Sequence, residues 1–255
     1  MSDLVLQASD LTRHFSRKGH PDVVAVDGVS LAIELGECVG LVGGSGCGKS
    51  TIANMIVGLI EPTSGTLLVN GHDVAHARGA QRRRLAQDVQ MVFQNPVASF
   101  DPRRTLGNGI AEGLRNFGMS SSQATERAAD LLEQCGLPRD FANRYPREVS
   151  GGQCQRAAIA RALALEPSLI ICDEATSALD VTVQSHIVSL LREVQKATGA
   201  ALLLICHDLA LVQGFCDNVA VMQAGKIVEA GSAERVIAQP QHSYTRQLLD
   251  SVLNV

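Results

Sequence analysis

The chain has 255 residues, a formal net charge of −4, 45% hydrophobic and 19% charged residues, 23 glycines and no tryptophan. This composition is typical of a soluble α/β protein with a buried core, and it excludes disordered, collagen-like and disulfide-scaffold chains. It indicates no nucleic-acid partner, because the charge is weakly negative and the basic run Arg82–Arg84 lacks interleaved aromatic residues, which fits a solvated helix face.

The first part of the chain alternates short β-like runs with one helical pattern. The early runs are Leu4–Ala8, Val23–Glu34 and Glu37–Gly43. A helix pattern then extends from Lys49 to about Ile60, and Ser64–Gly71 predicts a strand that ends in an Asn-Gly turn. Val89–Phe93 predicts another buried strand.

From Asn95 to Glu148 the chain shows turns and helical patterns but no convincing strand. This predicts a helical lobe inserted between two halves of a sheet domain. Strands resume at Ser168–Glu174 and Ala201–Asp208, with a helix between them. The apolar face of that helix carries Val183, Ile187, Leu190, Leu191 and Val194. Strands alternating with helices predict a mainly parallel, helix-covered sheet with ligands at the carboxyl ends of its strands.

The apolar runs and the cysteines bear on location. Ala200–Cys206 is strand-sized and far shorter than the roughly 20 residues of a membrane helix. The N-terminus lacks the organisation of a signal peptide. The seven cysteines form no C-x-x-C pair, which favours reduced thiols in a cytoplasm. Any connection to a membrane is therefore expected to run through a partner.

The stretch GGSGCGKST satisfies the phosphate-loop pattern G-x-x-x-x-G-K-[ST], between a strand and a helix as that loop requires. Its glycines let backbone amides surround phosphate oxygens. Lys49 should reach the β- and γ-phosphates, and Ser50 should coordinate Mg²⁺. The predicted nucleotide contacts in this loop are Gly43, Gly44, Ser45, Gly46, Cys47, Gly48, Lys49, Ser50 and Thr51.

Polar side chains follow three predicted strands at their carboxyl ends. Asp173 suits a Mg²⁺ shell, and Glu174 suits the orientation and deprotonation of an attacking water. His207 leaves the same sheet edge and is expected to contact the γ-phosphate, while Gln94 could sense Mg²⁺ or the water. The predicted catalytic residues are Glu174, His207 and Gln94, and the predicted Mg²⁺ ligands are Ser50, Gln94 and Asp173.

Several motifs occur in one order: the phosphate loop, FQNP with Gln94, SGGQ at Ser150–Gln153, CDE, SALD at Ser177–Asp180, and CHD. This order resembles the ATP-binding subunits of ABC transporters over nearly the whole chain. The resemblance implies an α/β fold: a P-loop NTPase (RecA-like) parallel-sheet core with an N-terminal antiparallel β subdomain and an inserted helical subdomain.

The resemblance also implies a division of the chain. Residues 1–255 would form a single ABC nucleotide-binding domain. Residues 1–94 and 159–230 would form the β and RecA-like core, 95–158 the helical signature subdomain, and 231–255 a short C-terminal helical tail.

In that family two cassettes face each other head to tail, and the SGGQ turn of one closes on the ATP held by the other. The residues implied to contact the partner's nucleotide are Ser150, Gly151, Gly152 and Gln153. Asp180 would line the dimer seam, and Phe15 would stack on adenine. The implied cofactors are ATP and Mg²⁺.

The implied partners are a second ABC ATPase subunit, in a homo- or heterodimer, and two integral membrane permease subunits. The segment after Gln94 would contact the permeases, and an extracytoplasmic solute-binding protein would act indirectly. The implied location is peripheral, on the cytoplasmic face of the inner (cell) membrane.

The stretches NPVASFDPR, SALDVTVQ and HSYTRQLL resemble the peptide/nickel import subfamily. The chain stops soon after HSYTRQLL, which resembles the shorter nickel or metal-chelate importers. Dipeptides, oligopeptides, glutathione-like peptides and nickel chelates all stay open as cargo.

A rival hypothesis is a soluble ABC-type ATPase of iron–sulphur assembly or DNA maintenance that acts without a permease. The DNA-associated class normally needs a long heptad insertion, which this chain lacks. An inactive nucleotide-binding module is disfavoured because Glu174 and His207 are both present.

Overall fold

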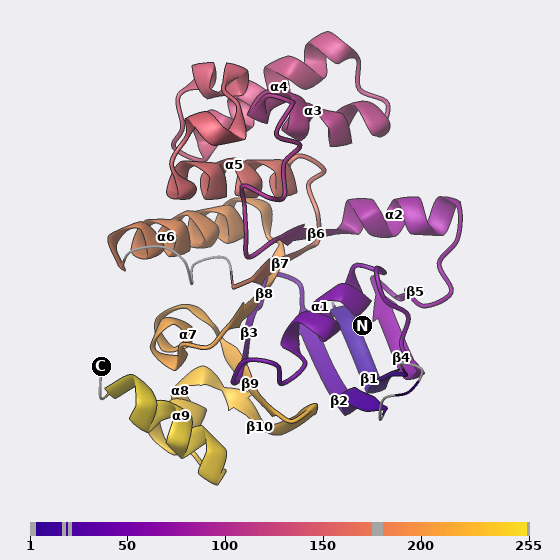
Figure 1. The fold of residues 1–255 in the computed structure, drawn as a ribbon, viewed down its shortest axis with the longest axis vertical. Coiled ribbons are helices and arrows are strands. Elements are labelled where there is room, and N and C mark those ends of the chain that lie inside the picture. The colour runs from indigo at the N-terminus through magenta and orange to yellow at the C-terminus, as the bar shows by residue number, and fades with distance from the viewer. Residues whose placement is uncertain (1–3, 17–18, 20–21, 175–180, 254–255) are drawn as a thin grey trace.

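The structure, a computed structural model, describes residues 4–16, 19, 22–174 and 181–253. Figure 1 shows a central sheet, a group of helices above it in that view, and a second sheet beside it. The helices of the upper group are α3 (Leu106–Asn116), α4 (Ser121–Gln134) and α5 (Gly151–Leu163).

The smaller sheet is antiparallel, with the strand order β2-β1-β4-β5. Its strands are β1 (Leu4–Phe15), β2 (Val23–Glu34), β4 (Ser64–Val69) and β5 (His72–Asp73). The first strand is longer than the predicted run Leu4–Ala8, because it continues through an irregular register between Ala8 and Leu11. Asp10 lies at this irregularity with a φ of 50°. The polar residues there hide the second half of the strand from a pattern search.

The larger sheet has the order β10-β9-β3-β8-β7-β6 and is parallel except at β10. Its strands are β3 (Cys38–Val42), β6 (Val89–Val92), β7 (Leu169–Asp173), β8 (Ala201–Cys206), β9 (Asn218–Gln223) and β10 (Lys226–Ser232). The motifs above predict neither β9 nor β10. The sequence pattern that could have indicated them is a pair of apolar runs on either side of Ala224-Gly225. These two turn residues both have a positive φ, as a tight hairpin turn requires.

The parallel sheet is buried on both faces, which explains its uninterrupted apolar strands. In β8, Leu203 and Ile205 face a core shared with α1 (Lys49–Ile56) and the antiparallel sheet. Leu202 and Leu204 face the opposite core. The helices that contribute to this second core include α6 (Val181–Thr198), α7 (Leu209–Phe215), α8 (Ala233–Ala238) and α9 (Ser243–Leu253).

The inserted helices are confirmed between β6 and β7. Besides α3, α4 and α5, this part holds the short 3₁₀ helices η1 (Arg139–Asn143) and η2 (Pro146–Glu148). Before it, α2 (Ala80–Asp88) presents Arg82–Arg84 as exposed side chains. The predicted α/β fold class is therefore confirmed, while the boundaries 1–94, 95–158, 159–230 and 231–255 stay predictions.

All seven cysteines are buried and free. Burial raises the pKa of the Cys172 and Cys206 thiols to about 12, so both stay protonated near neutral pH. Over the part of the chain that the structure describes, no helix combines the length and apolarity needed to cross a membrane.

Two glycines of α3 allow a test of the packing. Gly113→Ala is expected to raise the free energy of unfolding by about 0.5–1 kcal/mol, because alanine restricts the unfolded chain. Its new Cβ would meet the Leu165 side chain at an ordinary 3.8 Å. Gly107→Ala is expected to lower the free energy of unfolding, because its Cβ would lie 2.7 Å from the Ala142 carbonyl oxygen. Guanidinium chloride unfolding measures both, and a shift of both variants in the same direction would contradict this packing.

Candidate functional site

The phosphate loop joins β3 to α1 and depends on glycine at both ends. A Cβ at Gly43 would overlap the Met222 carbonyl oxygen, and one at Gly48 would overlap the Ala25 carbonyl oxygen. Gly48 also has a φ of 111° and is the N-cap of α1, where no side chain caps the helix. The first N–H groups of α1 are therefore free of side-chain caps and available to an anion.

Lys49 is the buried cation of this loop, with 4% of its surface exposed. Its Nζ donates to the carbonyl oxygens of Gly43 at 2.7 Å and Gly44 at 3.0 Å. The Sγ of Cys47 lies 3.8 Å from the same Nζ. The ammonium group therefore closes the loop on itself and carries a positive charge that can bind phosphate oxygens.

Asp173 ends β7 beside the start of α1. The Ser50 hydroxyl donates to its Oδ1 at 3.2 Å. Burial raises the pKa of Asp173 and the charge of Glu174 adds to this, while the Ser50 hydrogen bond and the charge of Lys49 oppose it. A cation would lower this pKa by compensating the buried carboxylate. Hydroxyl and carboxylate oxygens are the ligands that Mg²⁺ prefers, so this donor pair fits that ion.

Glu174 follows Asp173 in a left-handed backbone conformation, with a φ of 47°. Such a conformation is uncommon outside glycine and recurs at functional sites. Its N–H donates to the Ile205 carbonyl oxygen at 2.9 Å, which fixes the residue against β8. The Gln94 Nε2, just after β6, donates to Glu174 Oε2 at 2.6 Å. The ends of β6, β7 and β8 thus meet at Glu174, through its side chain at Gln94 and through its backbone at Ile205.

Lys49, Ser50, Gln94 and Glu174 border one cavity of about 260 Å³, and Asp173 lies behind Ser50 without lining it. Its lining residues are Ala25, Ser45, Gly46, Gly48, Lys49, Ser50, Thr51, Gln94 and Glu174. The sequence predicted all of them except Ala25, which lies in β2 and belongs to none of the motifs.

His207 and Phe15 lie farther out. His207 directly follows β8 and is exposed, but it is not among the described residues that line the cavity. Phe15 ends β1 with 38% of its surface exposed, and the Arg13 guanidinium carbon lies 4.6 Å from its ring centroid. An exposed ring backed by a cation can accept a stacked base.

The SGGQ turn starts α5 and forms a reciprocal capping box. The Gln153 N–H donates to Ser150 Oγ at 3.3 Å, and the Ser150 N–H donates to Gln153 Oε1 at 2.9 Å. Gly151 has open space around it. Ser150, Gly152 and Gln153 line a separate hollow of about 360 Å³, which shares no lining residue with the phosphate-loop cavity. Asp180 and the rest of the SALD motif lie outside the described residues.

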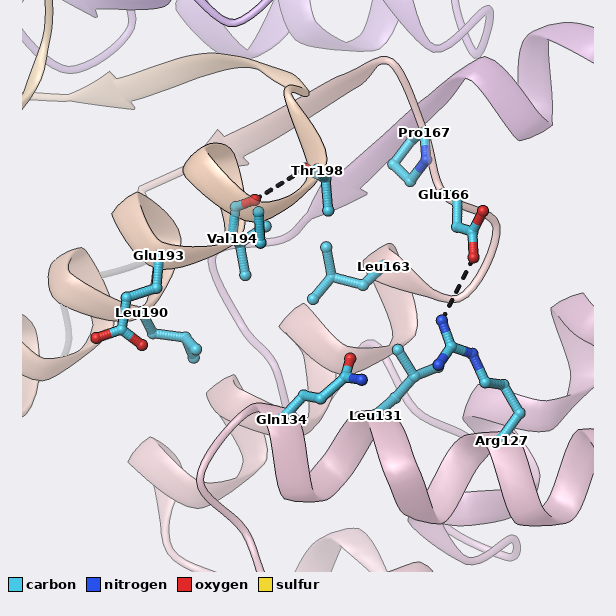
Figure 2. A pocket seen from close by; sticks show the side chains of 11 residues that line it. Arg127, Leu131, Gln134, Leu163, Glu166, Pro167, Leu190, Glu193, Val194 and Thr198 are labelled. Carbon is cyan, nitrogen blue, oxygen red and sulfur yellow. Dashed lines mark hydrogen bonds and ion pairs between the residues drawn. The ribbon is translucent and has the colours of Figure 1, made fainter.

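A larger hollow of about 500 Å³ lies between α4, the end of α5 and α6 (Figure 2). Leu131, Leu163 and Leu190 line it, and an ion pair of Arg127 with Glu166 at 3.4 Å lies at one side. None of the described residues predicted for the site lines this hollow. Its size therefore does not identify it as the reactive centre.

Three contacts of the loop have no counterpart in the sequence motifs. Met222 and Ala25 approach Gly43 and Gly48 through their carbonyl oxygens, which any residue type supplies. The Tyr244 hydroxyl accepts a hydrogen bond from the Gly44 N–H at 2.8 Å. HSYTRQLL contains this tyrosine, but the motif alone indicated a subfamily and no contact.

Comparison with known proteins agrees with the family resemblance of the sequence motifs. A family model described as "ABC transporter" matches residues 26–177. The chain is 48% identical to the probable peptide ABC transporter ATP-binding protein y4tS of Sinorhizobium fredii, over 98% of this chain and 72% of that protein. It is 44% identical to the oligopeptide transport ATP-binding protein OppF of Escherichia coli, over 98% of this chain and 78% of that protein.

Solved structures agree in fold. The ATP-binding cassette MJ0796, in a dimeric post-hydrolysis state bound to ADP and Pi, has a TM-score of 0.81 at 29% identity, over 89% of this chain and 98% of that chain. The cbiO1 protein of Clostridium perfringens, part of the ABC transporter complex cbiONQ, also has a TM-score of 0.81 at 29% identity, over 93% of this chain and 92% of that chain.

Proposed function

The chain belongs to the ABC transporter family of ATP-binding proteins, and on that basis we propose that it is the ATP-hydrolysing subunit of a peptide importer. The observation that carries this proposal is the cavity where Lys49, Ser50, Gln94 and Glu174 meet. It combines a phosphate-binding loop with the Glu174 carboxylate, and its Ser50 is hydrogen-bonded to Asp173 to form the magnesium-type donor pair. The relatives support a transporter subunit and lend no support to a soluble ATPase acting without a permease.

ATP would lie over the phosphate loop. The uncapped N–H groups at the start of α1 and the Lys49 ammonium would hold its β- and γ-phosphates, while the Gly44 N–H stays bonded to Tyr244. Phe15 would stack on adenine with its exposed ring face. Ser50, Asp173 and Gln94 would hold Mg²⁺, which neutralises charge on the phosphates when bound.

Hydrolysis would depend on Glu174 as the base that orients and deprotonates water. The hydrogen bond from Gln94 and the backbone bond to Ile205 hold its carboxylate in a fixed place at the cavity. A base placed in this way contributes about 10²–10⁴-fold to a rate. His207, at the next strand end, would contact the γ-phosphate.

The SGGQ turn would serve the nucleotide of a second cassette. Ser150 and Gln153 border a hollow distinct from the phosphate-loop cavity, so neither contacts the loop's own cavity. The start of α5 still has the polarity that favours an anion. A head-to-tail pair, either two copies or two different chains, would bring the turn onto the partner's γ-phosphate, with Asp180 at the seam.

The segment after Gln94 would transmit nucleotide state to the permeases. Arg161 of α5 donates to the Ser99 carbonyl oxygen at 2.5 Å and to Ser99 Oγ at 2.9 Å. Its guanidinium carbon also lies 4.2 Å from the Phe100 ring centroid. The segment is thus joined to Glu174 through Gln94 and to α5 through Arg161. A hollow of about 280 Å³ lined by Ser99, Phe100 and Asp101 would receive the membrane partner.

Two permease subunits would place the chain at the cytoplasmic face of the inner membrane as a peripheral subunit. An extracytoplasmic solute-binding protein would select the cargo and would act on this chain only indirectly, through the permeases. Nucleic acid has no part in this function. Peptides are the proposed cargo because the named relatives are peptide and oligopeptide transport proteins. The nickel and metal-chelate alternatives belong to the same subfamily, and neither of these two relatives is described as a nickel transport protein.

Replacement of the proposed base tests the chemistry. Glu174→Gln should retain MgATP binding but lower the turnover number by about 10²–10⁴-fold, because an amide cannot accept the proton from water. The variant should also accumulate as an ATP-bound dimer. Steady-state ATPase assays and size-exclusion chromatography measure these effects, and turnover at the wild-type rate would require another base.

The shared site is tested by Ser150→Arg, with Ser120→Arg as the matched control. Both serines are exposed N-caps that accept a hydrogen bond from a glutamine three residues later. Each change should therefore cost a similar cap energy of about 0.5–2 kcal/mol. Only Ser150→Arg should block ATP-dependent dimerisation and reduce ATPase activity, while leaving MgATP binding to the single chain intact. Equal ATPase activity of the two variants would contradict the shared site.

The cargo is tested on the chain assembled with its proposed permease subunits and solute-binding protein. ATPase activity in liposomes should rise when the binding protein is loaded with di- or oligopeptides. Nickel without peptide should leave the rate at its unloaded value. Stimulation by nickel alone would replace the peptide assignment with metal import.

A further inference from the structure

The C-terminal helix α9 contacts the phosphate loop directly. The Tyr244 hydroxyl accepts a 2.8 Å hydrogen bond from the Gly44 N–H, across 200 positions of sequence. Glycine has no side chain, so the position of Gly44 depends on the hydrogen bonds of its backbone N–H and carbonyl groups. None of the motifs that identify the site includes this contact.

Gly44 is held from both sides. Its carbonyl oxygen accepts from Lys49 Nζ at 3.0 Å, and its N–H donates to Tyr244. A Cβ at position 44 would lie 3.0 Å from the Tyr244 oxygen, so glycine matches the approach of the ring. The two bonds together fix the first half of the loop relative to the lysine that binds phosphate.

Tyr244 is itself held in place by the segment that precedes it. Its N–H donates to His242 Nδ1 at 3.2 Å. The N–H groups of His242 and Gln241 donate to the Glu229 carboxylate at 3.0 and 2.8 Å. Glu229 belongs to β10, which pairs with β9, and β9 pairs with β3, the strand that enters the loop. The strand β3 and Tyr244 are therefore connected to each other through β9, β10 and Glu229, and both contact the loop.

We propose that Tyr244 is a positioning residue that preorganises the phosphate loop for MgATP through its hydrogen bond to Gly44. The proposal rests on the proposed function, since it concerns the same nucleotide site. Tyr244 contacts the loop rather than the reacting phosphate. It should therefore affect the affinity of the loop for nucleotide more than the chemical step, because a preorganised site loses less freedom on binding.

Tyr244→Phe removes the hydroxyl and keeps the ring. The dissociation constant of MgATP on the full chain, measured by isothermal titration calorimetry, should rise about fivefold, the effect of one ordinary hydrogen bond. In the assembled transporter the KM for ATP should rise by a similar factor, while kcat stays within twofold. An MgATP affinity within twofold of wild type would overturn the proposal.

Leu249→Ala is the matched control on the same helix. Leu249 packs α9 against the core, and this change loosens the helix without altering the hydroxyl. MgATP affinity should stay within twofold of wild type although the melting temperature falls. A loss equal to that of Tyr244→Phe would show that helix docking alone matters and would overturn the role of the Gly44 bond.

A double-mutant cycle with Gly44→Ala isolates the contact. The added Cβ should weaken MgATP binding in the wild-type chain, where it crowds the hydroxyl at 3.0 Å, and less in the Tyr244→Phe chain. Strictly additive effects would count against the proposal.

A spectroscopic readout is available because the chain has two tyrosines and no tryptophan. In a Tyr145→Phe background all tyrosine emission comes from Tyr244. Titration with MgATP should change this emission, and the midpoint should give the dissociation constant found by calorimetry. An emission that stays unchanged at saturating MgATP would overturn the proposal. If the wild-type chain itself fails to bind MgATP, the proposed function fails. If wild type binds and Tyr244→Phe binds equally well, only this inference fails.

Discussion

The buried ammonium group of Lys49 is the constraint on which the rest of the site depends. Lys49 is 4% exposed, and its hydrogen bonds go to two loop carbonyl oxygens. The carbonyl oxygens accept its hydrogen bonds, and the nearby carboxylate of Asp173 interacts with its charge. A buried charge is costly away from water. A triphosphate supplies further negative charge in direct contact with it. The loop therefore has to keep its shape before the nucleotide arrives, and close backbone approaches at Gly43 and Gly48 provide that shape.

The parallel sheet converts this loop into a reaction site. Parallel strands present their carboxyl ends at one edge, so Gln94, Asp173 and His207 leave β6, β7 and β8 on the same side as the loop after β3. Glu174 reaches its place only through a left-handed backbone turn. The hydrogen bond from Gln94 then links the carboxylate to the segment that Arg161 holds against α5. One continuous set of contacts thus connects the proposed base, the inserted helices and the surface proposed to meet the permeases.

The same topology explains the division of labour between two cassettes. The chain between β6 and β7 leaves the sheet edge, forms α3 to α5, and returns. The SGGQ turn therefore starts a helix in the inserted group, at a hollow of its own. Its capping box holds Ser150 and Gln153 in a fixed arrangement through two hydrogen bonds within the turn. Such a preformed edge suits recognition of a phosphate that another chain presents.

The amino-acid sequence by itself determined the phosphate loop, the acids after β7, the capping turn of α5 and the family, because each depends on residue types at short spacing. It also predicted a mainly parallel, helix-covered sheet from strands that alternate with helices. Only the tertiary structure decided the bulged second half of β1, the approach of the Met222 and Ala25 carbonyl oxygens, and the bond from Gly44 to Tyr244. These contacts join residues far apart in the chain, and several use backbone atoms that every residue type carries. Sheet register and helix packing bring them together, and neither is written in a local pattern.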